Sequence, residues 1–141
     1  MWIGLSGCAP AEPEGVDARD LDPYADGALC EWHLGNPEVG QELFERPVLG
    51  SAAGCVTCHS LEPEVTLVGP SLYGAATTAA NRVEGVRADN YLYLSITLPN
   101  FHVVEGYQPD IMPHSYATEL TQLEITDLVS FLMTLTVSES P

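Results

Sequence analysis

The sequence predicts a small all-α domain, built from three to four short helices joined by long loops. Three segments carry helix start signals, and apolar residues recur in them at helical spacing. We find neither an internal repeat nor the alternation of apolar and polar residues that indicates strands. The 141-residue length corresponds to one domain with a single core.

The first helix is expected to begin at Asn36 and Pro37. Asn is a favourable N-cap residue, and Pro is tolerated at the first helical position. Pro47 is expected to end the helix. The residues near its apolar face are Val39, Leu43 and Phe44, with Gly40 beside them.

A second helix is expected to begin at Asp89 and to stop before Pro99. Its apolar residues are Tyr91, Leu92, Leu94 and Ile96.

The last helix has the strongest signals. Thr121 and Glu124 have the spacing of a capping box, in which each side chain bonds the other residue's backbone N–H. An apolar stripe follows at helical spacing, consisting of Leu120, Leu123, Leu128, Phe131, Leu132 and Leu135.

The chain is strongly acidic. It has 20 acidic residues, four arginines and no lysine, and its formal net charge is −16. Such a surface repels nucleic acid and anionic lipid headgroups, which argues against a function in binding either. An acidic surface suits a partner with a basic surface or a place inside a larger assembly. The alternative is that the charge only keeps the protein soluble.

The N-terminal region is expected to be separate from the domain. Residues 1–8 end in Leu5-Ser6-Gly7-Cys8, which resembles the bacterial lipobox, in which the cysteine is lipidated. The segment before Cys8 has no Lys or Arg and a short apolar run, so either the true start lies upstream or the match is chance. Residues 9–35 are rich in Pro, Gly, Asp and Glu and predict an extended acidic tether, which leaves 36–141 as the folded domain.

These helices alone bury little apolar surface for a chain of this size. The loops between them are long, and loops over about 12–15 residues are uncommon in compact domains unless they serve a function. A large apolar cofactor in the middle would solve this problem, because the loops could pack against it.

One motif identifies such a cofactor. Cys55-Val56-Thr57-Cys58-His59 is C-x-x-C-H, the haem attachment signature. Two thiols at this spacing can form thioethers with the two vinyl groups of one porphyrin, while the adjacent imidazole binds the iron. The alternatives are a zinc site, a redox dithiol or a disulfide. Zinc needs a second ligand pair, which the scattered Cys8 and Cys30 do not provide, and a thioredoxin-like dithiol needs a βαβ unit.

From residue 36 to about 135 the chain resembles the class I monohaem cytochromes c. The resemblance rests on Gly40 and Phe44 in the first helix, C-x-x-C-H, Val68-Gly69-Pro70-Ser71-Leu72-Tyr73-Gly74, Asp89-Asn90-Tyr91-Leu92, Tyr107-Gln108-Pro109-Asp110-Ile111-Met112-Pro113 and the apolar last helix. Residues 86–112 look most similar to the cytochrome domains of haem-copper oxidase subunit II. They also resemble the monohaem lipoprotein cytochromes of respiratory complexes, such as the subunit of alternative complex III.

The resemblance implies one covalent haem c, held by Cys55 and Cys58 and ligated by His59 and Met112. A thioether opposite a histidine favours the ferrous state and raises the reduction potential. Pro70 is expected to accept a hydrogen bond from the free ring nitrogen of His59. Arg82, with Arg87 as a neighbour, lies in the loop that passes the haem propionates in the family, and the alternative is a surface arginine. The family's first and last helices cross closely, so Gly40 would let the backbones approach and Phe44 would lie against Leu128 and Phe131.

Other residues could compete for these roles. His102, His114 and Met133 are rival axial ligands, but we expect the first two to be solvated loop residues and Met133 to be in the core. His33 is expected to be solvated in the tether. For Tyr73, Tyr91 and Tyr107, core packing is favoured over donation to propionates.

The resemblance implies one-electron transfer in a bacterial respiratory or photosynthetic chain and no enzymatic residue. Because haem c is attached outside the cytoplasm, we expect a periplasmic location or the outer face of the inner membrane. There Cys8 is either lipidated, which leaves Cys30 free or bonded to another chain, or paired with Cys30. A tethered subunit that relays electrons to redox protein partners in a larger complex is favoured over a freely diffusing carrier. A haem enzyme or sensor with an open sixth site and a structural subunit with a vestigial haem are further alternatives.

Overall fold

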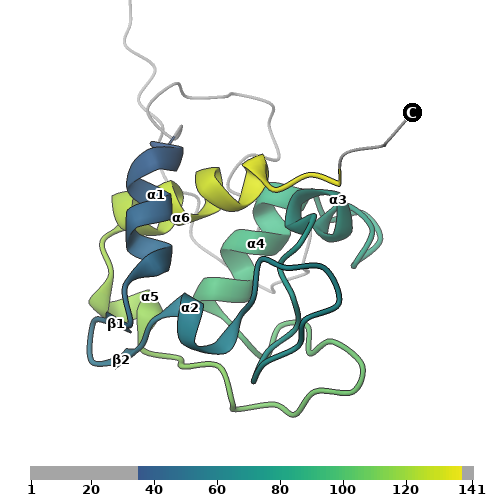
Figure 1. Cartoon of the computed structure of the whole chain (residues 1–141), viewed down its shortest axis with the longest axis horizontal. Helices are drawn as coiled ribbons and strands as arrows, with labels where there is room; N and C mark the ends of the chain where they lie inside the picture. Colours follow the sequence, from purple (N-terminus) through teal and green to yellow (C-terminus); the bar gives the residue numbers. More distant parts are fainter. Residues whose placement is uncertain (1–34, 138–141) are drawn as a thin grey trace, which may run out of the picture.

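The computed structural model describes residues 35–137 (Figure 1). The elements are α1 (Pro37–Glu45), β1 (Val48–Leu49), β2 (Ala52–Ala53), α2 (Cys55–Cys58), α3 (Ala75–Ala79), α4 (Ala88–Thr97), α5 (Tyr116–Glu119) and α6 (Gln122–Thr134). Cys8, Cys30, His33 and almost all of the predicted tether lie outside the described residues. Within the described residues, no helix has the length and apolar character needed to cross a membrane.

The start of α1 forms as predicted. The Asn36 carboxamide oxygen accepts hydrogen bonds from the backbone N–H groups of Glu38 and Val39, which the helix itself leaves unpaired. The helix ends at Glu45, before Pro47.

The start of α1 is also tied to α6. The Asn36 backbone N–H donates to the Asp127 carboxylate across 2.6 Å, and Asp127 is buried. This contact anchors the beginning of the folded domain on the last helix.

The other two predicted helices are also confirmed. α4 runs from Ala88 to Thr97 and ends before Pro99. At the start of α6, the Thr121 hydroxyl accepts from the Glu124 backbone N–H, and the Glu124 carboxylate accepts from the Thr121 N–H. The predicted capping box is therefore formed.

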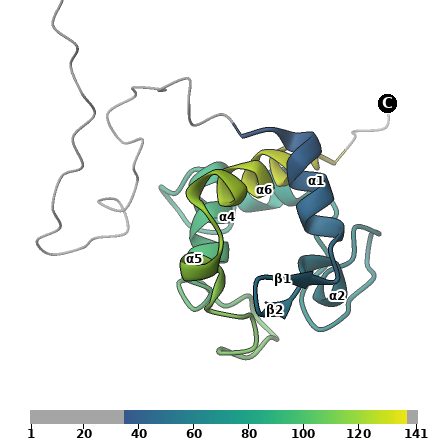
Figure 2. The same ribbon diagram turned by 90° about the vertical axis from the view of Figure 1, so that its left-hand side faces the viewer.

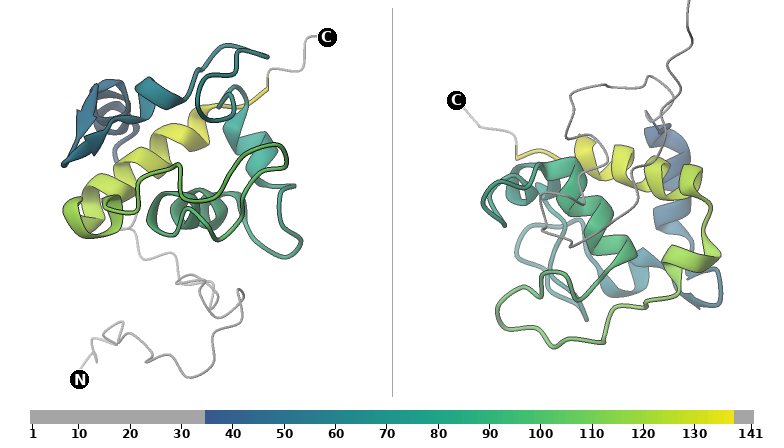
Figure 3. Two further views of the ribbon diagram at one scale, coloured as in Figure 1. Left: turned by 90° about the horizontal axis from the view of Figure 1, so that it is seen from below. Right: turned by 180° about the vertical axis from the view of Figure 1, so that it is seen from behind.

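α6 is the central element of the core. Figure 2 shows α1 crossing over α6, and Figure 3 shows α6 running between α1 and the hairpin on one side and α4 on the other. At the crossing, the Phe44 and Phe131 rings lie 5.4 Å apart in a tilted arrangement, and Leu128 is buried in the same cluster. The predicted contact between the first and last helices is confirmed.

The structure contains elements that the sequence did not indicate. The helices α2, α3 and α5 have four or five residues each. The strands β1 and β2 have two residues each and pair antiparallel as a hairpin. Such short helices contain too few turns to show an apolar periodicity.

Three apolar residues that were expected on buried faces or in the core are exposed. Val39 is 38% exposed, Leu123 is 61% exposed and Met133 is 37% exposed, so the expectation that Met133 lies in the core was wrong. Leu123 lies in the first turn of α6 and Met133 in its last turn.

Candidate haem crevice

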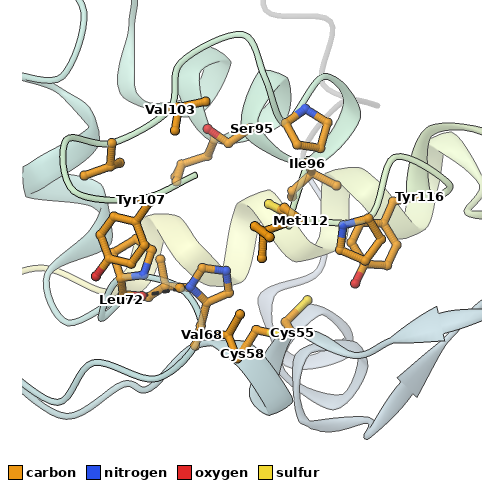
Figure 4. A pocket seen from close by; sticks show the side chains of 18 of the residues that line it. Cys55, Cys58, Val68, Leu72, Ser95, Ile96, Val103, Tyr107, Met112 and Tyr116 are labelled. Atoms are coloured by element: carbon orange, nitrogen blue, oxygen red, sulfur yellow. Dashed lines mark hydrogen bonds between the residues drawn. The ribbon is translucent and has the colours of Figure 1, made fainter. Parts of the chain in front are cut away.

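A large, mainly apolar cavity lies between the C-x-x-C-H segment, α4, α6 and the loop that joins α4 to α5. The apolar side chains that line it include Phe44, Leu72, Leu92, Ile96, Leu128 and Leu132. Cys55, Cys58, His59, Pro70 and Met112 line the same cavity, so the structure brings five of the predicted site residues together. Figure 4 shows Cys55 and Cys58 along one wall and Met112 across from them.

The His59 ring is held in one tautomer. Its Nδ1 lies 2.8 Å from the Pro70 carbonyl oxygen, and a carbonyl can only accept, so Nδ1 carries the proton. Burial lowers the pKa of His59, while the bond to Pro70 acts in the opposite direction. His59 is therefore a neutral imidazole with a free Nε2, which is the form that binds a metal ion.

Gly69 lies against the same ring. A Cβ built on Gly69 would lie 2.4 Å from His59 Cε1, which is too close for any side chain. The Gly69 N–H also donates to the Cys58 carbonyl across 2.8 Å. The Gly-Pro pair thus supplies both the room for the imidazole and the acceptor that orients it.

The helical turn α2 presents both cysteines to the cavity. Each is a free thiol and partly buried. Burial raises the pKa of Cys55 to about 11, so this thiol is protonated at neutral pH. Each thiol could form a thioether by addition of its S–H bond across one vinyl group of a porphyrin bound in the cavity.

Met112 comes from the loop between α4 and α5. It is partly buried, lines the cavity and packs against the core. Its rival Met133 is exposed on α6, and His114 is exposed and lies 3.3 Å from Asp110. Met112 is therefore the only methionine among the lining residues of this cavity.

The structure does not bring Arg82 to the cavity. Its side chain is exposed, and neither Arg82 nor Arg87 is a lining residue. Arg87 instead forms an ion pair with Asp89 at 2.6 Å. The hypothesis that Arg82 pairs with a propionate thus has no support from this geometry.

His102 differs from the expectation of a solvated loop residue. It is partly buried, lines the cavity and packs edge-on against Tyr91, with 5.8 Å between the ring centroids. Tyr91 is buried, as expected for core packing, and Tyr107 is partly buried at the cavity wall. Tyr73 is 42% exposed, so core packing was the wrong interpretation for it.

Sequence reasoning missed Tyr116. This residue of α5 is 3% exposed, lines the cavity, and its hydroxyl donates to the Ala53 carbonyl oxygen in the hairpin. Burial, reinforced by electrostatic interactions with Cys55 and Cys58, raises the pKa of Tyr116 to about 12. The one available signal was an aromatic residue shortly after Met112.

These features fit one covalent haem. The cavity combines apolar walls, two thiols on one helical turn, a neutral imidazole and a thioether sulfur. Among residues 35–137, no group of three or more His, Cys, Asp or Glu side chains is arranged to hold a metal ion. Cys55 and Cys58 would hold the porphyrin, and His59 and Met112 would ligate the iron.

Comparison with known proteins agrees with this site. The family model described as cytochrome c matches residues 38–136, which is most of the chain and all of the cavity. No curated protein matched. The chain belongs to the cytochrome c family and carries one covalent haem c.

Proposed function

We propose that this cytochrome is a membrane-tethered subunit of a bacterial respiratory or photosynthetic complex, in which it relays single electrons between redox proteins. Family membership implies haem-based electron transfer. The single observation that carries the electron-transfer role in this chain is the position of His59 and Met112 in one cavity. With both as axial ligands, the iron has no open site for a substrate.

The bound haem supplies a one-electron couple. The protein's own residues set its properties: the Pro70 carbonyl increases the basicity of His59, and the thioether of Met112 favours the reduced iron. The apolar walls exclude water, which limits the reorganisation that accompanies each electron transfer. No side chain has to act as an acid, base or nucleophile.

The cavity reaches the surface beside exposed apolar residues. Val68 is 55% exposed and Ile111 is 58% exposed, and both also line the cavity. Acidic residues lie nearby in the chain, including Glu62, Glu64 and Asp110. A partner with an apolar centre and basic surroundings would complement this face and bring its own cofactor within short range.

Salt dependence tests whether the chain is a subunit or a diffusing carrier. A subunit held in a complex receives electrons without a diffusional encounter, so its reduction rate should change little with ionic strength. A freely diffusing carrier this acidic should show a strong salt dependence. A strong dependence measured in native membranes would reject the subunit assignment.

Purification from native membranes in mild detergent tests the tether and the complex. The proposal predicts co-purifying subunits and a lipid mass on the N-terminal peptide that contains Cys8. Quantitative release of unmodified protein by a salt wash would contradict it. A high-spin ferric spectrum would instead favour the rival function, a haem enzyme or sensor with an open sixth site.

A further inference from the structure

The short helix α5 is bonded to the β1–β2 hairpin at two points. At the first point, the buried Tyr116 hydroxyl donates to the Ala53 carbonyl oxygen. At the second, the Glu119 carboxylate accepts from the Ser51 N–H and from the Ser51 hydroxyl, each across 2.6 Å. We call these three hydrogen bonds the α5 clamp.

The hairpin is suited to this contact. Gly50 has φ +64°, a conformation that favours glycine, and a Cβ at this position would lie 2.2 Å from a Glu119 carboxylate oxygen. The glycine therefore lets Glu119 close over the turn and reach Ser51.

The clamp connects the two segments that hold the predicted haem. On the hairpin side, Gly54 separates Ala53 from Cys55, and the Gly54 N–H donates to the Pro47 carbonyl across 2.8 Å. On the other side, Tyr116 follows Met112 and Pro113 closely in the chain. The loop that carries Met112 is thus tied directly to the segment that carries the first thioether.

Met112 lies in the long loop that joins α4 to α5, so the points at which this loop is fixed determine how freely Met112 can move. No helix or strand lies between α4, which ends at Thr97, and α5, which begins at Tyr116. Two hydrogen bonds link the two arms of this loop. The Asp110 N–H donates to the Asn100 side-chain oxygen across 3.0 Å, and the Asn100 side-chain amide donates to the Asp110 carboxylate across 2.7 Å. The α5 clamp is where the end of the loop is fixed to another part of the protein.

We infer that Tyr116 and Glu119 are positioning residues that keep the Met112 thioether on the haem iron by holding the end of its loop against the attachment segment. This inference rests on the proposed haem ligation by His59 and Met112. Glu119 does not line the cavity, and Tyr116 lines it but is not a proposed ligand, so both would act on Met112 through the loop. Without the clamp the loop should open more often, and Met112 should leave the iron more often.

The test measures how fast imidazole binds to the ferric holoprotein, because imidazole can enter only when Met112 leaves. The variants are Tyr116→Phe, which removes one hydroxyl and keeps the ring, and Glu119→Ala, which removes both acceptors. A hydrogen bond of ordinary strength predicts an increase in the binding rate of about three- to tenfold for each variant. Glu119→Gln keeps one acceptor oxygen and should restore part of the wild-type rate.

Two control variants separate positioning from general destabilisation. Glu84→Ala removes an exposed carboxylate from the loop before α4 and should leave the rate at the wild-type value. Phe131→Leu weakens the α1–α6 crossing, so it lowers global stability without touching the clamp. A clamp variant should accelerate imidazole binding more than Phe131→Leu does at equal loss of global stability.

The outcomes distinguish the two levels of the proposal. A wild-type ferric protein without the near-infrared sulfur-to-iron band would reject Met112 ligation and the clamp's role together. The band with unchanged imidazole rates in Tyr116→Phe and Glu119→Ala would overturn the clamp alone. Rates that simply follow global stability across all variants would also overturn it.

Discussion

Gly40 of α1 lies so close to Asp127 of α6 that a Cβ added to the glycine would fall 1.9 Å from the Asp127 carbonyl oxygen. The same Cβ would lie 2.8 Å from Phe131 Cβ. Because both obstacles are fixed parts of α6, no rotamer change can relieve them. The close crossing of the two helices therefore depends on the absence of a side chain at position 40.

Gly40→Ala is expected to destabilise the protein, although alanine favours a helix over glycine by about 1 kcal/mol. The added methyl group must push α1 away from α6, and overpacking of this kind costs about 1–3 kcal/mol. Chemical denaturation of the holoprotein, followed by helix content, measures the change in free energy of unfolding.

The matched control is Glu42→Ala, on the exposed side of the same helix. It should change stability by less than about 0.5 kcal/mol. A Gly40→Ala protein as stable as the wild type would show that the two backbones are not held this close.

Gly69→Ala is expected to disturb the axial imidazole. The new methyl group would overlap the His59 ring, which cannot move without breaking its 2.8 Å bond to Pro70. We predict a weaker iron–histidine bond, a lower yield of low-spin holoprotein and a loss of about 1–3 kcal/mol of stability. Visible absorption during denaturant unfolding reports the ligation and the stability in one experiment.

The control for this change is Thr66→Ala, at an exposed position in the same loop. It should leave the spectrum of the wild type intact. Identical spectra for Gly69→Ala and the wild type would contradict the tight contact between residue 69 and the imidazole.

Helix ends could be predicted wherever a local chemical rule governs them. Asn36 and Thr121 are effective caps because their side chains reach N–H groups only two or three residues away. The exposure of Leu123 and Met133 could not be predicted in this way, because it depends on tertiary packing around α6 and not on a local rule. The four-residue α5 bonds to the distant hairpin, and no local pattern in the sequence indicates that contact.

In the site, too, features set by neighbouring residues could be predicted, and features set by distant contacts could not. Cys55, Cys58 and His59 are adjacent in the chain, so their joint chemistry could be read from spacing alone. Tyr116 bonds to Ala53 and His102 packs on Tyr91, and neither pairing leaves a local pattern in the sequence. Arg82 was chosen by its place in the family's loop, and here that loop leaves the side chain in solvent.

Met112→Ala is expected to abolish the sulfur-to-iron band of the ferric protein and to convert it to a high-spin form. Loss of the thioether also removes its preference for the reduced iron, so the reduction potential should fall. Near-infrared absorption and a spectroelectrochemical titration provide the two readouts. Met133→Ala is the matched control, because that methionine is exposed on α6. A band that survives Met112→Ala would assign the sixth position to another residue.

Two carboxylates, those of Glu119 and Glu124, make part of the stability dependent on pH. Hydrogen bonds from the side chain and backbone of Ser51 lower the pKa of Glu119, and the backbone and side chain of Thr121 lower that of Glu124, both below the ordinary 4.5. A carboxyl with a lower pKa in the folded state binds fewer protons there than when unfolded. Its stabilising effect is therefore complete above about pH 4.5 and is lost as pH falls through the folded-state pKa.

Glu119→Gln and Glu124→Gln should thus be less stable than the wild type at pH 7, and the difference should shrink as pH falls below 4.5. Thermal unfolding of the wild type and both variants between pH 3 and pH 7 measures this difference directly. Comparing each variant with the wild type at the same pH removes the effect of titrating the other acidic residues of the chain. Glu84→Gln controls for the loss of one negative charge. A constant difference across this range would show that these carboxylates contribute nothing through their ionised form.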